Sequence, residues 1–493
     1  MKIARSHLGI IVITILAAIV RLAAVFNIGD FSWDEMFSFT YSQKPWLESL
    51  KFWLWETNPP SHMLFLKIWF NFFPKNEIWA RLPSIALGIA SIPLFYNLAR
   101  RMFTARVGFI AAALLAFSPY HISISSIARG YSLLIFLTIL SACLFYRIFF
   151  TDKSSKKLAY AYGIISAFVL FTHLTSVILL LGQLAIILAI QKNKKRLWLK
   201  LNSIPIALWL IWTVFSLAGK FNLETSSGAW FFLMENSWLN ALITLRVLLI
   251  GSTSGLAWMI IFVLIFSAIL YTVWRQLMNG KIESNYLICL VLGLLPIFNS
   301  ALFHTWDAKF MAISLPWLYI LIAHTLQTYV KIPALQTLAA ASLLLPGLTF
   351  FFVSLPISDW RGLDAYINRH CAKDKKQILI YNHFIDKLLL NRYYEGCVLS
   401  IPYASKNELN EWDKSVIKEN YLRFPHSEEE VSAWIKENNI NSFEELFLLK
   451  TDDVGVEMEP VLKKHGWQLA EIERAYAPVG KTLLRYVNNR QER

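Results

Sequence analysis

Charged residues are scarce in this chain of 493 residues, and acidic residues are few in most of it. Only 16% of the residues are charged, whereas a soluble domain carries about 25%. Residues 1–355 hold 27 basic and 11 acidic residues, and the remaining tail holds 20 basic and 22 acidic residues. With 56% hydrophobic residues, this distribution excludes a protein that is soluble throughout.

Several patterns that indicate other chemistries are also missing. The sequence has no Gly-rich phosphate loop, no repeat and no basic patch interleaved with aromatics, so it gives no sign of nucleic-acid binding. Its four cysteines lack metal-ligand spacing. Cys143 and Cys289 lie in apolar stretches and are expected to be inert. Cys371 and Cys397 lie in the tail, where a disulfide requires an oxidising compartment and side chains that meet.

Long apolar stretches are what the chain does contain. A bilayer core of about 30 Å requires roughly 20 apolar residues in a helix. This criterion predicts about eleven transmembrane helices, at residues 7–26, 82–99, 107–120, 131–150, 158–173, 174–191, 197–218, 255–274, 286–303, 310–329 and 333–353. The first stretch is too long for a cleavable signal and is followed by Trp33, Asp34 and Glu35 instead of a cleavage site. Arg21, near its end, is expected to extend to the membrane interface.

Clusters of basic residues predict the orientation of these helices. The clusters occur in alternate loops and comprise Lys2 and Arg5, Arg100 with Arg101 and Arg106, Lys153 with Lys156 and Lys157, Lys192 to Arg196, Arg275 with Lys281, and Lys331. By the positive-inside rule their side is cytoplasmic, so the N-terminus is cytoplasmic and the tail extracytoplasmic. The stretch 62–74 is apolar but short and interrupted by Lys67, so it is interpreted as a helix lying in the interface.

The change in polarity near Pro356 predicts two domains. Residues 1–355 form a transmembrane domain whose first outer loop spans residues 27–81, and residues 356–493 form a soluble extracytoplasmic domain. The tail contains two segments typical of strands and two typical of helices, at 377–382, 481–488, 384–394 and 428–438. This order predicts a small α/β domain.

Nothing in the tail indicates catalysis. His383 and Asp386 are three residues apart on an expected helix, and we interpret them as solvated surface groups.

The first outer loop concentrates the rare acidic residues of the membrane part. Six of the eleven lie there, namely Asp30, Asp34, Glu35, Glu48, Glu56 and Glu77. A loop of 55 residues is too long for a simple connection, and long loops on a rigid scaffold often carry binding or catalysis. The alternative is that the acids are solvated and the loop tryptophans form an interface belt. Asp34 and Glu35, directly after the first predicted helix, favour the functional interpretation.

Four polar or cationic groups are predicted at the same outer level. They are Arg81, Arg129, His173 and Lys309, each near the end of a predicted transmembrane helix. A single cation at a helix end is more often an interface anchor, but four together suit an anionic headgroup, because Arg and Lys hold phosphates by charge-assisted hydrogen bonds. A carboxylate facing them can act as a general base, while the cations stabilise a departing phosphate.

These motifs resemble the polyprenol-dependent glycosyltransferases of the GT-C superfamily, specifically glycosyltransferase family 39. That family includes the protein O-mannosyltransferases and the lipid A aminoarabinose transferases. The resemblance rests on the order and spacing of several segments, namely Asp34-Glu35, ETNPPSHMLFLKIWF (56–70), EIWARLPSIALGIASIPLFYNLARRMF (77–103), SPYHISISSIARGYSLLIFLTILS (118–141), FTHLTSVILLLGQ (171–183), Lys309-Phe310 and SDWRGLDAYI (358–367).

The resemblance implies a GT-C fold and inverting transfer of a hexosyl or pentosyl group from a polyprenyl phosphate to an acceptor hydroxyl. It assigns Asp34 as general base and Glu35 as the group that positions the acceptor or Asp34. Arg81, Arg129 and Lys309 would bind the donor phosphate. Further substrate contacts are expected from His173, Glu56, Asn58 and Tyr131.

Three departures from the family pattern bear on the substrates. Asn58 replaces a His, Ser126-Ile127 replaces a Gln-Glu pair, and Lys309 replaces an Arg, which loses bidentate geometry. We predict no cofactor and no metal, although some relatives use a divalent ion. The expected partners are the lipid-linked donor, membrane lipids and a glycan, lipid or protein acceptor, in a prokaryotic plasma membrane.

Other functions remain open at this stage. A transporter or flippase of a lipid-linked or anionic substrate would carry paired charges within its helices and inverted repeats. A scaffolding protein would not require an acid-rich loop opposite cations. An O-antigen ligase or polymerase would carry its large loop in mid-chain, whereas the long loop here is the first one. The identities of sugar, acceptor and polyprenol, and the oligomeric state, do not follow from the sequence.

Overall fold

The computed structural model describes residues 2–56, 58–151, 155–221, 238–252, 256–280, 282–354, 358–372, 374–381, 384–403, 427–451, 458–473 and 481–488. Their contacts divide the chain into two compact units. Unit 1 comprises Met1–Phe26 and Ser42–Ser354, and unit 2 comprises Asn27–Tyr41 and Leu355–Arg493. Residues 27–41, which the sequence analysis assigned to a loop of the membrane domain, therefore group with the C-terminal part of the chain.

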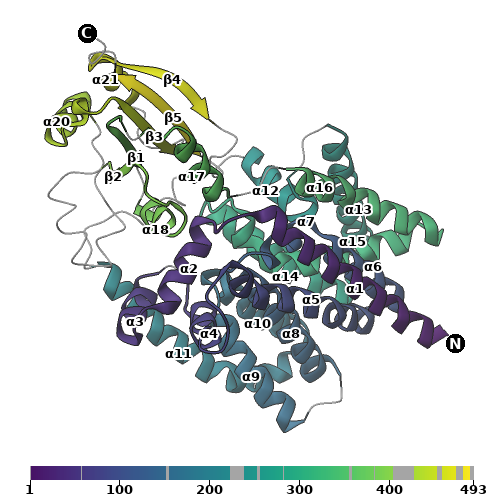
Figure 1. Cartoon of the computed structure of the whole chain (residues 1–493). Helices are drawn as coiled ribbons and strands as arrows, with labels where there is room; N and C mark the ends of the chain where they lie inside the picture. The colour runs from purple at the N-terminus through teal and green to yellow at the C-terminus, as the bar shows by residue number, and fades with distance from the viewer. Residues whose placement is uncertain are drawn as a thin grey trace. The chain divides into compact units, whose positions relative to one another are not determined.

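Unit 1 is helical in its described residues (Figure 1). Its α-helices are α1 (Lys2–Ile28, to Phe26), α3 (Trp46–Trp55), α4 (Ser61–Trp69), α5 (Glu77–Met102), α6 (Ala105–Phe117), α7 (Pro119–Ser125), α8 (Tyr131–Phe150), α9 (Lys156–Leu170), α10 (Val177–Ile190), α11 (Lys195–Phe221), α12 (Trp238–Ile250), α13 (Leu256–Met278), α14 (Ser284–Leu302), α15 (Leu315–Tyr329) and α16 (Pro333–Val353). Short 3₁₀ segments are η1 (Leu174–Ser176), η2 (Lys192–Lys194) and η4 (Ala308–Ser314).

Each of the eleven stretches predicted to cross the membrane falls on one or two of these helices. Seven helices of the described residues are long and apolar enough to span a bilayer, and the bent α6–α7 pair adds an eighth if it counts as one span. Shorter apolar helices cover Leu174–Ile190, Leu239–Ile250 and Val263–Met278, so the number eleven stays a prediction. Helix α4 has nine residues, or about 14 Å at 1.5 Å per residue. It is too short to span, as expected for the stretch 62–74.

The core of unit 1 forms around α5, α6, α8 and α15. Helix α5 packs against α6 and α8, and α15 packs against α6 and α14. In the segment Ala308–Tyr329, 83% of an 18-residue apolar stretch is buried, whereas the corresponding share for α1 is 28%. Helix α15 is therefore central, and α1 lies at the periphery with one side covered.

Arg21 contradicts the expectation that it extends to the interface. Its side chain is 0% exposed. Its guanidinium donates to the carbonyls of Ala17, Leu115 and Ala116 and to Ser125 Oγ, and it contacts His121 Nδ1 at 2.7 Å. Leu115 and Ala116 belong to the last turn of α6, where carbonyls lack helical partners. Arg21 therefore caps α6 at the 57° bend that separates it from α7.

Unit 2 combines a five-stranded sheet with helices, so the expected α/β class is confirmed. Its elements are α2 (Trp33–Gln43, to Tyr41), α17 (Trp360–Arg369), β1 (Gln377–Tyr381), α18 (Phe384–Tyr393), β2 (Leu399–Pro402), α20 (Glu428–Glu437), η6 (Ile440–Ser442), β3 (Glu445–Thr451), α21 (Met458–Lys464), β4 (Trp467–Glu473) and β5 (Lys481–Asn488). The strand order is β2-β1-β3-β5-β4. Strand β1 pairs in parallel with β2 and β3, whereas β5 pairs in antiparallel fashion with β3 and β4.

Strand β1 is central, and all five of its residues are buried. This explains its continuous apolar sequence, which is typical of a parallel strand covered on both faces. One face of the sheet packs against α20 and α21 in a core that includes Ile378, Ile380, Leu446, Leu448, Val431, Trp434, Val461 and Leu462.

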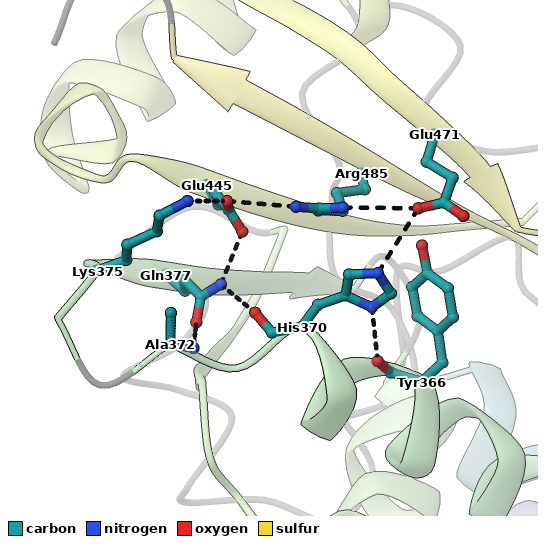
Figure 2. Close-up of polar contacts among 8 residues, drawn as sticks. All are labelled: Tyr366, His370, Ala372, Lys375, Gln377, Glu445, Glu471 and Arg485. Carbon is teal, nitrogen blue, oxygen red and sulfur yellow. Dashed lines mark hydrogen bonds and ion pairs between the residues drawn. The ribbon is translucent and has the colours of Figure 1, made fainter. Parts of the chain in front are cut away.

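A chain of polar contacts runs from Lys375 and Gln377, at the start of β1, through Glu445 on β3 to Arg485 on β5 and Glu471 on β4 (Figure 2). The buried Glu445 carboxylate accepts hydrogen bonds from Lys375 Nζ at 2.8 Å and Gln377 Nε2 at 2.7 Å. Arg485 lies between Glu445 and Glu471, at 3.4 and 3.6 Å. Burial raises the pKa of Glu445, but these hydrogen bonds and the Arg485 charge outweigh it, so the pKa lies below its usual value.

Candidate functional site

His62, in the first turn of α4, was not among the residues singled out from the sequence. Pro60 precedes the helix, and the Ser61 backbone N–H donates to the carbonyl of Phe171 at 3.0 Å, which joins α4 to the end of α9. The His62 side chain is 6% exposed. Neither of its ring nitrogens has a hydrogen-bond partner among the described residues.

Arg129 lies beside His62, in the short connection between α7 and α8. An ideal Cβ on Gly130 would lie 3.3 Å from His62 Cβ, so the absence of a side chain at Gly130 permits this close approach. The carbonyl of Arg129 accepts from Ser84 Oγ at 3.3 Å, which fixes the connection to α5. Its guanidinium is 5.9 Å from the ring centroid of Tyr131, and the residue is 9% exposed.

Arg81 is buried on α5, one turn before Ser84. Because Ser84 bonds to Arg129, Arg81 belongs to the same side of unit 1. This supports the grouping of two of the three cations that the sequence analysis assigned to donor phosphate.

His173 approaches the same group from the α9–η1 connection. Its ring centroid is 5.7 Å from that of Tyr131 and 6.0 Å from that of Phe310. Nδ1 accepts from the Thr175 backbone N–H at 3.2 Å and so caps η1. The ring proton must then be on Nε2, which is buried and has no partner among the described residues. His173 thus presents an N–H donor.

Both histidines are neutral at physiological pH. Burial, and then the positive charge of Arg129, lower the pKa of His62 to about 3. His173 is neutral as well, because its Nδ1 accepts a hydrogen bond and therefore carries no proton. Each ring can therefore donate one hydrogen bond and accept another, which suits sugar hydroxyls and phosphate oxygens.

Lys309 completes the group. It forms an ion pair with Asp307, which the sequence analysis did not consider. Its Nζ is 3.2 Å from Asp307 Oδ2 and 5.5 Å from the ring centroid of Phe310. Asp307 also accepts from the Lys309 backbone N–H and caps η4. A phosphate that binds Lys309 would therefore compete with Asp307.

We call His62, Arg129, Tyr131, His173 and Lys309 the Arg129 cluster. The structure thus brings together four of the predicted phosphate- or substrate-binding residues, Arg129, Tyr131, His173 and Lys309, with the additional His62. Glu56 and Asn58 contact one another, since the Asn58 N–H lies 3.5 Å from Glu56 Oε1. Within the described ranges, no hydrogen bond or ion pair joins either of them to the cluster.

Asp34 and Glu35 lie in unit 2, in the first turn of α2. Glu35 is 0% exposed and forms a capping box, because its carboxylate accepts from the Ser32 N–H at 3.0 Å and its own N–H lies 3.4 Å from Ser32 Oγ. Glu35 therefore fixes the start of the helix that carries Asp34. Asp34 itself is partly buried, and its carbonyl accepts from Ser38 Oγ at 3.3 Å.

A metal site does not emerge from the described parts of either unit. Among those residues, no group of three or more His, Cys, Asp or Glu side chains is arranged to hold an ion. The expected absence of a cofactor stays a prediction.

Comparisons with known proteins define the fold. Residues 57–218 match the family described as dolichyl-phosphate-mannose-protein mannosyltransferase. The chain is similar to ArnT from Cupriavidus metallidurans in the apo state, with 14% identity and a TM-score of 0.58 over 96% of this chain and 97% of that one. The same enzyme bound to undecaprenyl phosphate matches with 14% identity and a TM-score of 0.54, over the same shares.

A second protein of known structure also matches. The archaeal oligosaccharyltransferase AglB from Archaeoglobus fulgidus, in complex with an inhibitory peptide and a dolichol-phosphate, matches with 11% identity and a TM-score of 0.54. The match covers 98% of this chain and 74% of that one. No curated protein sequence matches the chain. The predicted GT-C fold, with its C-terminal α/β domain, is confirmed, and the chain is a multi-pass membrane protein.

Proposed function

We propose that this chain is an inverting glycosyltransferase that moves a sugar from a polyprenyl-phosphate donor to an acceptor hydroxyl. The observation that carries the proposal is the Arg129 cluster, where a buried guanidinium lies beside two neutral histidines with unpartnered ring nitrogens. A fixed guanidinium binds phosphate bidentately, and neutral imidazoles bind hydroxyls without adding charge. The family match over 57–218 and the solved relatives bound to undecaprenyl phosphate or dolichol-phosphate support this class of donor.

The reaction divides between two groups of residues. Asp34 takes the proton from the acceptor hydroxyl, whose oxygen forms the new bond to the anomeric carbon as the bond to the donor phosphate oxygen breaks. Arg129, Arg81 and Lys309 bind the donor phosphate and stabilise its charge as it leaves. His173 and Tyr131 contact the sugar or phosphate, and Glu56 and Asn58 contribute further substrate contacts.

The cellular setting forms part of the proposal. The donor lipid and the basic loops suit a prokaryotic plasma membrane, with the N-terminus cytoplasmic and the C-terminal domain extracytoplasmic. The acceptor is a glycan, lipid or protein hydroxyl. No metal ion enters the proposed chemistry.

The first experiment measures transfer of labelled sugar from short-chain polyprenyl-phosphate sugars by the purified protein. We expect Asp34→Asn to abolish transfer while donor binding persists, and Arg129→Met to weaken donor binding. Asp374→Asn, at an exposed turn, is the matched control and should retain full activity. Absence of both transfer and donor binding in wild type, across a broad panel of sugars, would refute the proposal.

A transporter or flippase is the alternative function. Arg21 is a charge within a membrane helix, as a transporter would require, but its described contacts are to helix carbonyls, a hydroxyl and an imidazole. These contacts indicate a structural cap. Movement of the labelled lipid across vesicles without sugar transfer would favour the alternative.

A further inference from the structure

The segment that precedes Asp34 is built into the C-terminal part of unit 2. Gly29 and Ser358 form a parallel β-bridge, and the Asp30 N–H donates to the Ser358 carbonyl at 2.9 Å. Ser358 Oγ donates to the carbonyl of Phe31 at 2.9 Å. The buried Asp30 carboxylate accepts from the Arg361 backbone N–H at 2.8 Å and pairs with its guanidinium. Residues 29–31 are therefore held by the start of α17.

Helix α18 holds the same segment through a second set of contacts. The Phe31 N–H donates to Tyr393 Oη at 3.0 Å. The Arg392 guanidinium lies 5.2 Å from the ring centroid of Phe31 and 4.7 Å from that of Phe39. The two phenylalanine rings also contact each other, with centroids 4.9 Å apart. Arg392 thus lies against an aromatic pair formed by Phe31, just before α2, and Phe39, within α2.

Asp386, on α18, contacts Trp33, the residue directly before the proposed base Asp34. Its Oδ1 accepts from Trp33 Nε1–H at 3.2 Å, and its side chain is 0% exposed. The sequence analysis interpreted Asp386 as a solvated surface group, which is wrong, because its side chain is buried and accepts a hydrogen bond from Trp33. Trp33 immediately precedes Asp34, and Glu35 immediately follows it in the capping box with Ser32. Both sequence neighbours of Asp34 are therefore fixed by hydrogen bonds.

We propose that Asp386 and Trp33 are positioning residues for Asp34, so that the C-terminal domain contributes to the chemical step. The proposal rests on the proposed function, in which Asp34 is the general base. A buried carboxylate that accepts an indole N–H fixes the rotation of the Trp33 side chain and hence the first turn of α2. Because a general base must lie within hydrogen-bond reach of its proton, a shift of about 1 Å reduces the rate on the order of 10²-fold.

The test uses the full-length protein and three single variants. Asp386→Leu removes the acceptor, Trp33→Phe removes the indole N–H but keeps an aromatic ring, and Asp386→Asn keeps a carbonyl oxygen at Oδ1. We expect Asp386→Leu and Trp33→Phe each to lower kcat by about 10- to 100-fold with an unchanged KM for the donor. Asp386→Asn should restore most of kcat. The matched control, Asp374→Leu at an exposed turn, should behave as wild type.

The double variant and the pH profile separate positioning from a general loss of structure. If the two residues act as one unit, Trp33→Phe combined with Asp386→Leu loses no more kcat than either change alone. The acid limb of the kcat profile, which reports Asp34, should shift in these variants and not in the control. Wild-type kcat in Asp386→Leu, or a matching loss in Asp386→Asn, would overturn the proposal.

Backbone hydrogen exchange keeps this inference distinct from the proposed function. Asp386→Leu should raise exchange in residues 33–41 and leave exchange in β1 and β3 unchanged. If wild type transfers no sugar, the proposed function fails. If, in addition, hydrogen exchange in residues 33–41 of Asp386→Leu is the same as in wild type, the positioning role is overturned as well. If wild type transfers and Asp34→Asn does not, the variants at Asp386 and Trp33 decide the inference alone.

Discussion

Replacing Arg21 by methionine should destabilise unit 1 at the bend between α6 and α7. In a continuous helix the carbonyl of Leu115 would accept from residue 119, but Pro119 has no N–H. The Arg21 guanidinium provides a donor instead, at 3.4 Å from Leu115 O and 2.9 Å from Ala116 O. Each buried carbonyl left without a donor costs about 1–3 kcal/mol, and more where lipid excludes water. Removing a buried cation offsets part of this loss. We therefore expect Arg21→Met to lower the free energy of unfolding by about 2–4 kcal/mol.

The assay is denaturant unfolding of the purified protein in mild detergent, followed by tryptophan fluorescence. Arg101→Met is the matched control, since Arg101 is exposed at the end of α5 and should change stability by less than about 0.5 kcal/mol. If Arg21→Met unfolds at the same denaturant concentration as the control, the capping argument is refuted. Since α7 leads directly to Arg129, a loss of stability should also weaken donor binding.

Three further changes test other contacts. Glu445→Gln should destabilise unit 2 by about 1–3 kcal/mol at pH 7. Because the folded-state pKa of Glu445 is lowered, its contribution is present above the unfolded pKa and lost as pH falls through the folded one. The difference between Glu445→Gln and wild type should therefore vanish in acid, and a constant difference would contradict this. Gly347→Ala should lower the melting temperature of unit 1, since a Cβ there would lie 1.8 Å from the carbonyl oxygen of Ile250, and an unchanged melt would oppose this. Both thiols are free in this structure, but Cys371 Sγ lies 3.5 Å from the Cys397 carbonyl. We therefore expect Cys371 and Cys397 to be alkylated without prior reduction, and labelling that requires reduction would contradict this by showing that the two are joined in a disulfide.

Hydropathy was sufficient to locate most of the helices of unit 1, because a bilayer requires long apolar runs. It missed α12, which has 13 residues and lies between the predicted helices 197–218 and 255–274. It also did not show that the stretch 107–120 is broken, although Pro119 marks the position of the bend. In unit 2 the buried strand β1 was predicted, whereas β4, with alternating burial, was not.

The sequence identified part of the candidate site. Arg129, His173 and Lys309 could be identified because each is a polar or cationic residue at the outer end of a predicted transmembrane helix. His62 could not be identified, because its proximity to Arg129 depends on Gly130, which is 68 residues later in the chain. The role of Asp386 was equally hidden, since its partner Trp33 is 353 residues earlier in the chain. Contacts at such separations are set by the fold and leave no local pattern.

The discontinuity of unit 2 has a consequence for biosynthesis. The 313 residues of Ser42–Ser354 separate the segment Asn27–Tyr41 from its partners in α17 and α18. At roughly 5–20 residues per second, a ribosome needs about 15 to 60 s to synthesise them. Phe31 and Phe39 are synthesised early, and Arg392, which packs against them, is synthesised only after the whole helical unit. A nascent or truncated chain that lacks the C-terminal domain would thus expose this apolar segment, which makes it a natural recognition element for chaperones or proteases that remove incomplete copies.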